Sequence, residues 1–143
     1  MNKATLKDFD KIWSIFKKYK NVFPHIRTDY LKRQIKSRNV IFENNVVLIT
    51  SKYKRKVNLG NRTFDKDTII IHQIVNDAIG NGCSSVLFKK FLNEVRNKII
   101  LTVRKSNEIA RRFYKKNNFK KVGKIFWSNN QIEGVIYEYN TTI

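Results

Sequence analysis

Acidic residues are scarce in this 143-residue sequence, which has 30 lysines and arginines but only 11 aspartates and glutamates. The formal net charge is therefore +19. The sequence is rich in Asn, Lys and Ile, as an AT-rich genome would encode, but such a bias explains the lysines and not the shortage of acids. A charge this large attracts polyanions, so we expect a nucleic acid or another strongly acidic partner. The alternative is compositional drift that also favours solubility.

Cysteine and long apolar runs are also nearly absent. The single cysteine, Cys83, excludes an internal disulfide and a cysteine-based metal cage, and we predict no metal site. No apolar run approaches the roughly 20 residues that span a bilayer. The first ten residues lack the apolar segment of a secretory signal. Together these absences favour a cytoplasmic protein without a membrane partner.

The apolar residues suffice for a core, because 41% of the chain is hydrophobic and 13% is aromatic. We therefore expect one domain over residues 1–143. Apolar residues at helical spacing predict helices over residues 6–19, 28–38, 84–96 and 106–117. In the third helix the core face would comprise Val86, Leu87, Phe91, Leu92 and Val95.

Short apolar runs predict strands over residues 40–42, 46–49, 68–75, 99–103, 121–127 and 132–139. Residues 59–65 read as a polar loop or a hairpin tip. The run over residues 68–75 is almost unbroken, which fits a central strand buried on both faces. The predicted order is ααββ-βαβα-ββ, an α/β fold whose mixed sheet has a parallel βαβ unit in its middle.

One stretch in the second half of the chain carries a recognisable pattern, in which a short strand runs into a helix that starts near Ser106. Six residues stand at fixed offsets along it: Leu101, Val103, Asn107, Ala110, Tyr114 and Phe119. This pattern resembles the second half of the acetyl-CoA-binding core of GNAT N-acetyltransferases, L-x-V-x-x-x-N-x-x-A-x-x-x-Y-x-x-x-G-F. Asn118 stands at the family's glycine, and asparagine best replaces glycine where φ must be positive. The predicted order of elements is also that of GNAT enzymes.

The resemblance implies an acyltransferase that moves acetyl from acetyl-CoA to an amine, with Tyr114 protonating the departing CoA thiolate. A phenol suits this task because it stays protonated at neutral pH. The alternative is a core role, since Phe113 and Tyr114 lie together on an amphipathic helix. Asn107 resembles the family asparagine that contacts the cofactor arm, or it caps the helix. Arg111 flanks the cofactor helix and could grip the CoA 3′-phosphate.

The segment after the long apolar strand resembles the family's pyrophosphate loop, R/Q-x-x-G-x-G/A. The residues that would bind the diphosphate are Gly80, Asn81, Gly82, Cys83, Ser84 and Ser85. Glycine lets the backbone approach a phosphate, and the free N–H groups at the helix start hold the anion. The usual Arg or Gln falls on Ile79, which supplies no cation. The alternative is a tight strand-to-helix connection.

In the family, the backbone of the central strand pairs with the pantetheine arm, which here places Ile74 and Val75 beside it. One of their N–H groups would polarise the thioester carbonyl. The sequence does not identify a general base. His72 on the central strand and His25 in the break between the first two helices are the candidates, because histidine accepts a proton near neutral pH. Alternatively, His72 is a structural imidazole and His25 caps a helix entry.

Two other functions remain open. Basic clusters alternate with Tyr and Trp along the chain, which would suit stacking on unpaired bases. Phage Mom-type proteins look like GNAT relatives that modify DNA bases, so a nucleic-acid-modifying enzyme is the second hypothesis. A non-catalytic binding module on the same fold is the third, because no general base is evident. The sequence sets neither the acceptor nor the oligomeric state.

Overall fold

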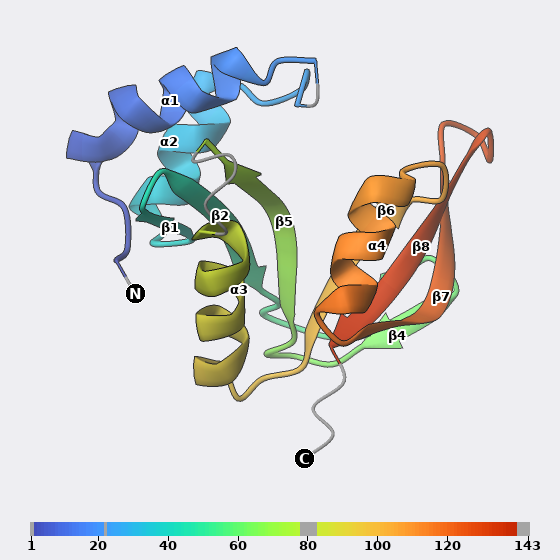
Figure 1. Ribbon diagram of the computed structural model, residues 1–143. Helices are drawn as coiled ribbons and strands as arrows, with labels where there is room; N and C mark the ends of the chain where they lie inside the picture. The colour runs from blue at the N-terminus through green and yellow to red at the C-terminus, as the bar shows by residue number, and fades with distance from the viewer. Residues whose placement is uncertain (1, 22, 78–82, 140–143) are drawn as a thin grey trace. The chain divides into compact units, whose positions relative to one another are not determined.

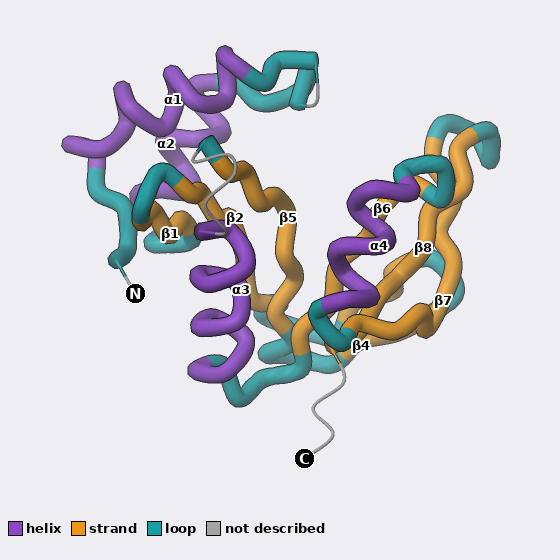
Figure 2. Tube along the Cα trace, viewed as in Figure 1, coloured by secondary structure: helices purple, strands orange, loops and turns teal. Residues whose placement is uncertain are grey.

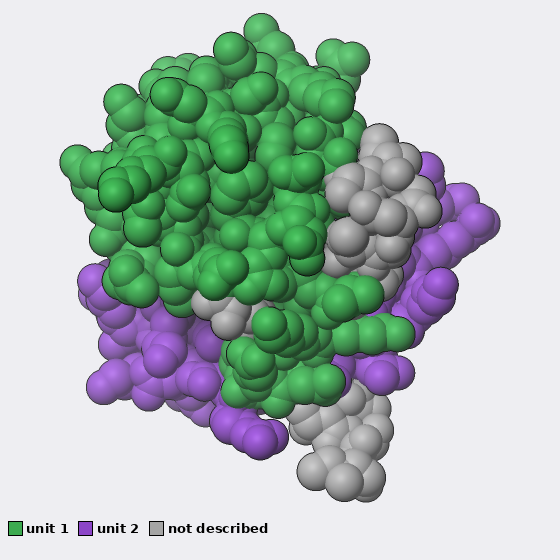
Figure 3. Space-filling model, turned by 60° about the vertical axis from the view of Figure 1, so that its left-hand side comes forward, with its two compact units in different colours: residues 1–50, 73–95 green, residues 51–72, 96–143 purple. Residues whose placement is uncertain are grey.

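The computed structural model describes residues 2–21, 23–77 and 83–139, with only the backbone of residues 83–85. The chain divides into two compact units, shown in different colours in Figure 3. Unit 1 comprises residues 1–50 and 73–95, and unit 2 comprises residues 51–72 and 96–143. Strand β5 (Ile69–Asn76) begins in unit 2 and ends in unit 1. The single domain expected from the sequence stays a prediction.

Unit 1 contains the first three α-helices and the N-terminal hairpin (Figures 1 and 2). A 3₁₀ turn, η1 (Leu6–Asp8), leads into α1 (Phe9–Lys18), which is followed by α2 (Thr28–Lys36). Strands β1 (Val40–Glu43) and β2 (Val46–Lys52) pair antiparallel, and Asn44 and Asn45 form the turn that joins them. Both asparagines have positive φ, 51° and 61°, the conformation that a two-residue I′ hairpin turn requires. Helix α3 (Cys83–Glu94) follows β5.

The core of unit 1 is formed by the apolar faces of α1 and α2 and by the strands. Ile12 and Phe16 of α1 and Leu31 of α2 are buried with Ile49 and Val75. Helix α3 buries Leu87, Phe88, Phe91 and Leu92, while Val86 is 67% exposed. The predicted core position of Val86 is therefore wrong. The four buried residues are one or four positions apart or nearly so, which places them on one face of the helix. Val86 lies outside this face.

Unit 2 contains the C-terminal strands of the main sheet, a helix and a separate two-stranded hairpin. Strands β3 (Val57–Leu59) and β4 (Arg62–Phe64) form the hairpin. Strand β6 (Ile99–Arg104) pairs parallel with β5, beginning with Ile69 beside Ile99. Helix α4 (Glu108–Lys116) then leads to the antiparallel pair β7 (Phe119–Trp127) and β8 (Ile132–Tyr139). The six-stranded mixed sheet has the order β1-β2-β5-β6-β8-β7.

The predicted α/β fold with a central parallel βαβ unit is confirmed, with one addition. Residues 59–65, read as a loop or hairpin tip, belong to the separate β3–β4 hairpin. The central strand is not buried throughout, because His72 is exposed. Asn118 has φ of 67°, as its place at the family's glycine predicted. No helix in the described part of the chain is long and apolar enough to cross a membrane.

Candidate functional site

The segment β6–α4–β7 places the six motif residues in unit 2. Leu101 and Val103 are buried in β6 and lie opposite Tyr137 and Val135 of β8. Asn107 caps α4, because its side-chain oxygen accepts a hydrogen bond from the Ala110 backbone N–H at 3.1 Å. The capping alternative for Asn107 is thus confirmed. Its contact with a cofactor stays a prediction.

Tyr114 packs within a cluster of aromatic rings. Its ring centroid lies 5.5 Å from that of Phe113, 5.8 Å from that of Phe119 and 6.5 Å from that of Tyr137. Burial raises the pKa of Tyr114 to about 12, because the surrounding rings disfavour a phenolate. The hydroxyl therefore stays protonated across the physiological range. The ring of Tyr114 is thus half-buried among other aromatic rings. Its role as the acid that protonates the CoA thiolate stays a prediction.

Arg111 is held by groups of its own unit. Its Nη1 donates to the Lys105 carbonyl at 2.8 Å, and its Nε donates to the Tyr137 hydroxyl at 3.3 Å. Arg111 therefore ties the first turn of α4 to β8. Sequence reasoning missed this role, because Arg111 and Tyr137 lie 26 positions apart in the chain. Its predicted contact with the CoA 3′-phosphate is not tested.

In unit 1, two tyrosines reach from the helices to the end of β5. The Tyr19 hydroxyl donates to Asp77 at 3.2 Å, and the Tyr30 hydroxyl donates to Gln73 at 3.3 Å. Lys18 Nζ lies 2.9 Å from Asp77 and holds the pKa of that carboxyl below its usual range. Asp77 is therefore an ionised carboxylate. No sequence pattern signals these pairs, because the partners lie 43 and 58 positions apart in the chain.

The predicted diphosphate-binding segment lies largely outside the described residues. Gly80, Asn81 and Gly82 belong to the part of the chain that the structure does not describe, and the side chains of Cys83, Ser84 and Ser85 are likewise not described. The structure does place the start of α3 at Cys83. Val75 is buried in the core of unit 1, and Ile74 is half-buried.

The two candidate bases differ in their surroundings. His25 is exposed in the turn between α1 and α2. The His72 Nε2 atom lies 2.7 Å from Ser51 Oγ, a distance at which the serine hydroxyl can donate to the neutral ring. Part of the His72 side chain is exposed, yet the protein around it desolvates the charged form and lowers the pKa of His72. His72 is therefore neutral at pH 7.

His72 and Tyr114 lie on opposite faces of the sheet in unit 2. Side chains alternate along a strand, so His72 shares a face with Ile70, which packs against the β3–β4 hairpin together with Ile136. Tyr137 follows Ile136 and points the other way, and the Tyr114 ring packs near it. This placement separates His72 from the side of the sheet on which Tyr114 lies.

Replacing His72 with glutamine should make the stability of the protein less dependent on pH between about 7 and 5. Because the pKa of His72 is lower in the folded chain than in the unfolded chain, the unfolded state binds the proton first as the pH falls below about 6.5. The stability linked to the neutral ring is therefore present above that pH and lost on acidification. Urea unfolding at several pH values measures this, with His25→Gln as the control for losing a histidine elsewhere. A steeper loss of stability in His72→Gln than in the wild type would contradict it.

No protein-family model matches this chain, and no curated protein matches its sequence. Solved structures do match. A GNAT-family acetyltransferase from Bacillus cereus has 20% identity over 99% of this chain and 96% of its own, with a TM-score of 0.72. NAA60 from Arabidopsis thaliana, in complex with acetyl-CoA, has 13% identity over 96% of each chain and a TM-score of 0.66.

Naa50 from Arabidopsis thaliana, in complex with the bisubstrate analogue CoA-Ac-MVNAL, has 17% identity. The match covers 97% of this chain and 96% of that chain, with a TM-score of 0.68. At these identities the likeness establishes the fold. The chain therefore has the fold of the GNAT acetyltransferases over nearly its whole length, as the motif over residues 101–119 predicted.

Proposed function

We propose that this chain is an acyl-CoA-dependent N-acyltransferase that transfers acetyl from acetyl-CoA to an amine. The observation that carries the proposal is the position of the GNAT motif in the fold. Its strand, cap, helix and turn residues occupy β6, α4 and the start of β7, in the order that the family pattern requires. Solved structures with this fold include complexes with acetyl-CoA and with a CoA bisubstrate analogue.

The chain's own residues fit a CoA diphosphate in two respects. Helix α3 begins at Cys83, directly after the glycine-containing segment over residues 80–82, so its first N–H groups lack partners within the helix. The residues at its start have small side chains, namely Cys83, Ser84 and Ser85. We propose that these amides hold the diphosphate, and that the backbone of Ile74 and Val75 pairs with the pantetheine arm.

In the reaction, the amine nitrogen attacks the thioester carbonyl carbon, the C–N bond forms, and the C–S bond breaks. The electron pair leaves on sulfur, and we propose that the Tyr114 hydroxyl donates a hydrogen bond to it. A thiol has a pKa of about 8.5, whereas the pKa of Tyr114 is raised to about 12. The phenol therefore stabilises the developing thiolate as a donor and need not surrender its proton completely.

The proton lost by the amine must go to a base or to water. His72 lies on the other face of the sheet in unit 2 from Tyr114, which argues against joint action on one substrate. His25 is exposed at the α1–α2 turn and remains the proposed histidine base, with solvent as the simplest alternative acceptor. The structure favours neither a DNA-base substrate nor a peptide for this reaction.

Calorimetric titration with acetyl-CoA, followed by assay of CoA release with an amine panel, tests the proposal. The panel should contain polyamines, lysine peptides and peptides with free N-termini. Binding heat together with CoA release that depends on the amine supports an N-acyltransferase. Binding without transfer to any amine would leave a non-catalytic module, and the absence of binding would remove the proposal altogether.

A further inference from the structure

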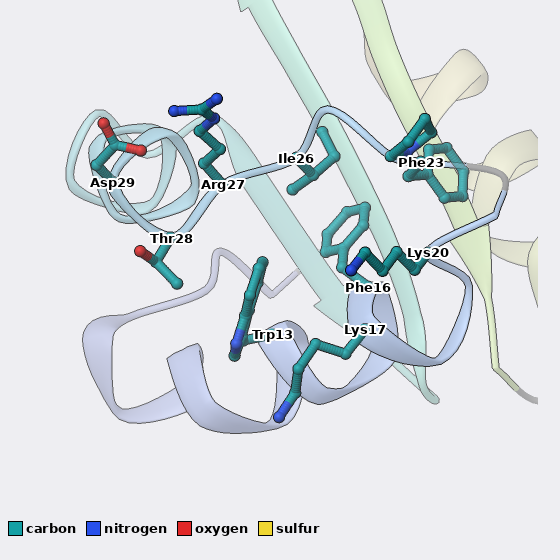
Figure 4. Close-up of a pocket in the computed structure, with 10 residues that line it drawn as sticks. Trp13, Phe16, Lys17, Lys20, Phe23, Ile26, Arg27, Thr28 and Asp29 are labelled. Carbon is teal, nitrogen blue, oxygen red and sulfur yellow. The ribbon is translucent and has the colours of Figure 1, made fainter.

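An open groove of about 740 Å³ lies in unit 1, between α1 and the segment that connects it to α2 (Figure 4). Phe16 and Phe23 line the groove, and their rings meet edge to face with centroids 5.6 Å apart. The half-buried Trp13 lines the groove from α1 and packs against the core of unit 1. The groove therefore offers a fixed indole and apolar surface to a ligand.

Three cations line the same groove: Lys17 from α1, Lys20 from the following turn and Arg27 just before α2. All three are exposed, and within residues 2–21, 23–77 and 83–139 none of them forms an ion pair. Lys18, by contrast, is bound to Asp77. The groove thus presents unneutralised positive charge beside an aromatic surface.

One acid, Asp29, also lines the groove. Its Oδ1 accepts a hydrogen bond from the backbone N–H of Tyr30 at 2.9 Å, at the start of α2. A single carboxylate leaves the lining with a positive balance. The groove therefore suits an anionic ligand that also has a flat apolar face.

We propose that this groove binds a segment of single-stranded nucleic acid. An unpaired base would stack on Trp13, while the flanking phosphates would contact Lys17, Lys20 and Arg27. The Asp and Glu side chains of an acidic polypeptide supply the charge but no aromatic face for the indole. The net charge of +19 gives the whole chain the long-range attraction for a polyanion that such binding needs. The proposal does not depend on acyl transfer.

The tryptophans provide a local probe. The chain has two, Trp13 and Trp127, so the variant Trp127→Phe leaves Trp13 as the sole indole. Trp127 lies in unit 2 on β7, where its ring packs over Gly134, and phenylalanine keeps an aromatic side chain there. Titration of this variant with a single-stranded oligothymidylate should quench the Trp13 fluorescence, because stacking brings a base against the indole.

A pair of charge-matched variants separates the groove from the general positive charge. The double variant Lys17→Gln with Lys20→Gln should weaken oligonucleotide binding about tenfold at moderate salt. It should also reduce the slope of log K against log salt by about 0.7 for each lysine removed. The control, Lys89→Gln with Lys90→Gln, removes the same charge from exposed positions of α3 in the same unit. It should bind within about twofold of the wild type.

Each outcome decides the proposal. The proposal is supported if the oligonucleotide quenches Trp13 fluorescence and if only the Lys17→Gln, Lys20→Gln variant loses affinity for it. An equal loss of affinity in the two double variants, or binding without quenching, would assign the binding to diffuse charge and overturn the proposal. Poly-glutamate that binds as tightly and quenches Trp13 equally would also overturn it, in favour of an acidic polypeptide. An absence of acetyl-CoA binding would defeat the proposed acyl transfer but would leave these results unaffected.

Discussion

Replacement of Tyr114 by phenylalanine should lower the turnover number for acetyl transfer about 100-fold, with little change in acetyl-CoA affinity. The ring remains in its cluster with Phe113, Phe119 and Tyr137, so the substitution removes only the hydroxyl. A positioned acid contributes about 10²–10⁴-fold to a rate. We expect the lower end of this range, because in the proposed mechanism a phenol with a pKa of about 12 would donate a hydrogen bond to the thiolate without full proton transfer. Steady-state kinetics with a saturating amine measures the effect.

The matched control for this experiment is Tyr139→Phe. Tyr139 belongs to the same aromatic region, with its ring centroid 5.5 Å from that of Phe119, and it loses the same hydroxyl. The control should turn over at close to the wild-type rate. Both variants should unfold within about 1 kcal/mol of the wild type, the typical net contribution of one hydrogen bond. Wild-type turnover in Tyr114→Phe would reduce Tyr114 to its core role.

The pH profile gives a second measure of the same side chain. An acid is effective below its pKa, and the pKa of Tyr114 is raised to about 12. Titration of Tyr114 therefore causes no loss of turnover on the alkaline side below about pH 10. An alkaline limb that appears in the wild type below that pH and disappears in Tyr114→Phe would mean that the hydroxyl titrates earlier than its burial indicates.

Local patterns were sufficient to predict most of the fold. Helix α4 follows from the helical spacing of its apolar residues and strand β6 from a short apolar run. The positive φ of Asn118 follows from the glycine that it replaces in the family pattern. These features depend on residues close together in sequence. The β3–β4 hairpin was only partly evident, because its strands have three residues each and no long alternation of apolar and polar residues.

The site was less predictable, because its contacts join distant residues. The Arg111–Tyr137 and Tyr19–Asp77 hydrogen bonds leave no periodic trace in one sequence. Asn107 illustrates a different limit, since asparagine at a helix start fits both a cap and a ligand contact. The structure shows the cap directly, with its oxygen 3.1 Å from the Ala110 nitrogen.

Replacement of Gly82 by glutamate should weaken acetyl-CoA binding about 1,000-fold. The new carboxylate would lie in the segment proposed to hold the diphosphate, directly before the start of α3 at Cys83. Two like charges about 4 Å apart repel by about 4 kcal/mol at an effective dielectric constant of about 20. Since about 1.4 kcal/mol corresponds to a factor of ten in affinity, this repulsion accounts for the expected loss. Isothermal titration calorimetry with acetyl-CoA measures it.

The direction of the helix dipole separates an effect of Gly82→Glu on binding from an effect on the stability of α3. A negative charge at the N-terminal end of α3 stabilises the helix by about 0.3–1 kcal/mol, so lost binding in Gly82→Glu would not reflect a weakened α3. Urea unfolding checks this directly. The control Asn93→Glu adds the same charge at an exposed position near the other end of α3 and should bind acetyl-CoA like the wild type. If Gly82→Glu and Asn93→Glu both bind with wild-type affinity, the diphosphate lies elsewhere, and the glycines serve only to connect β5 to α3.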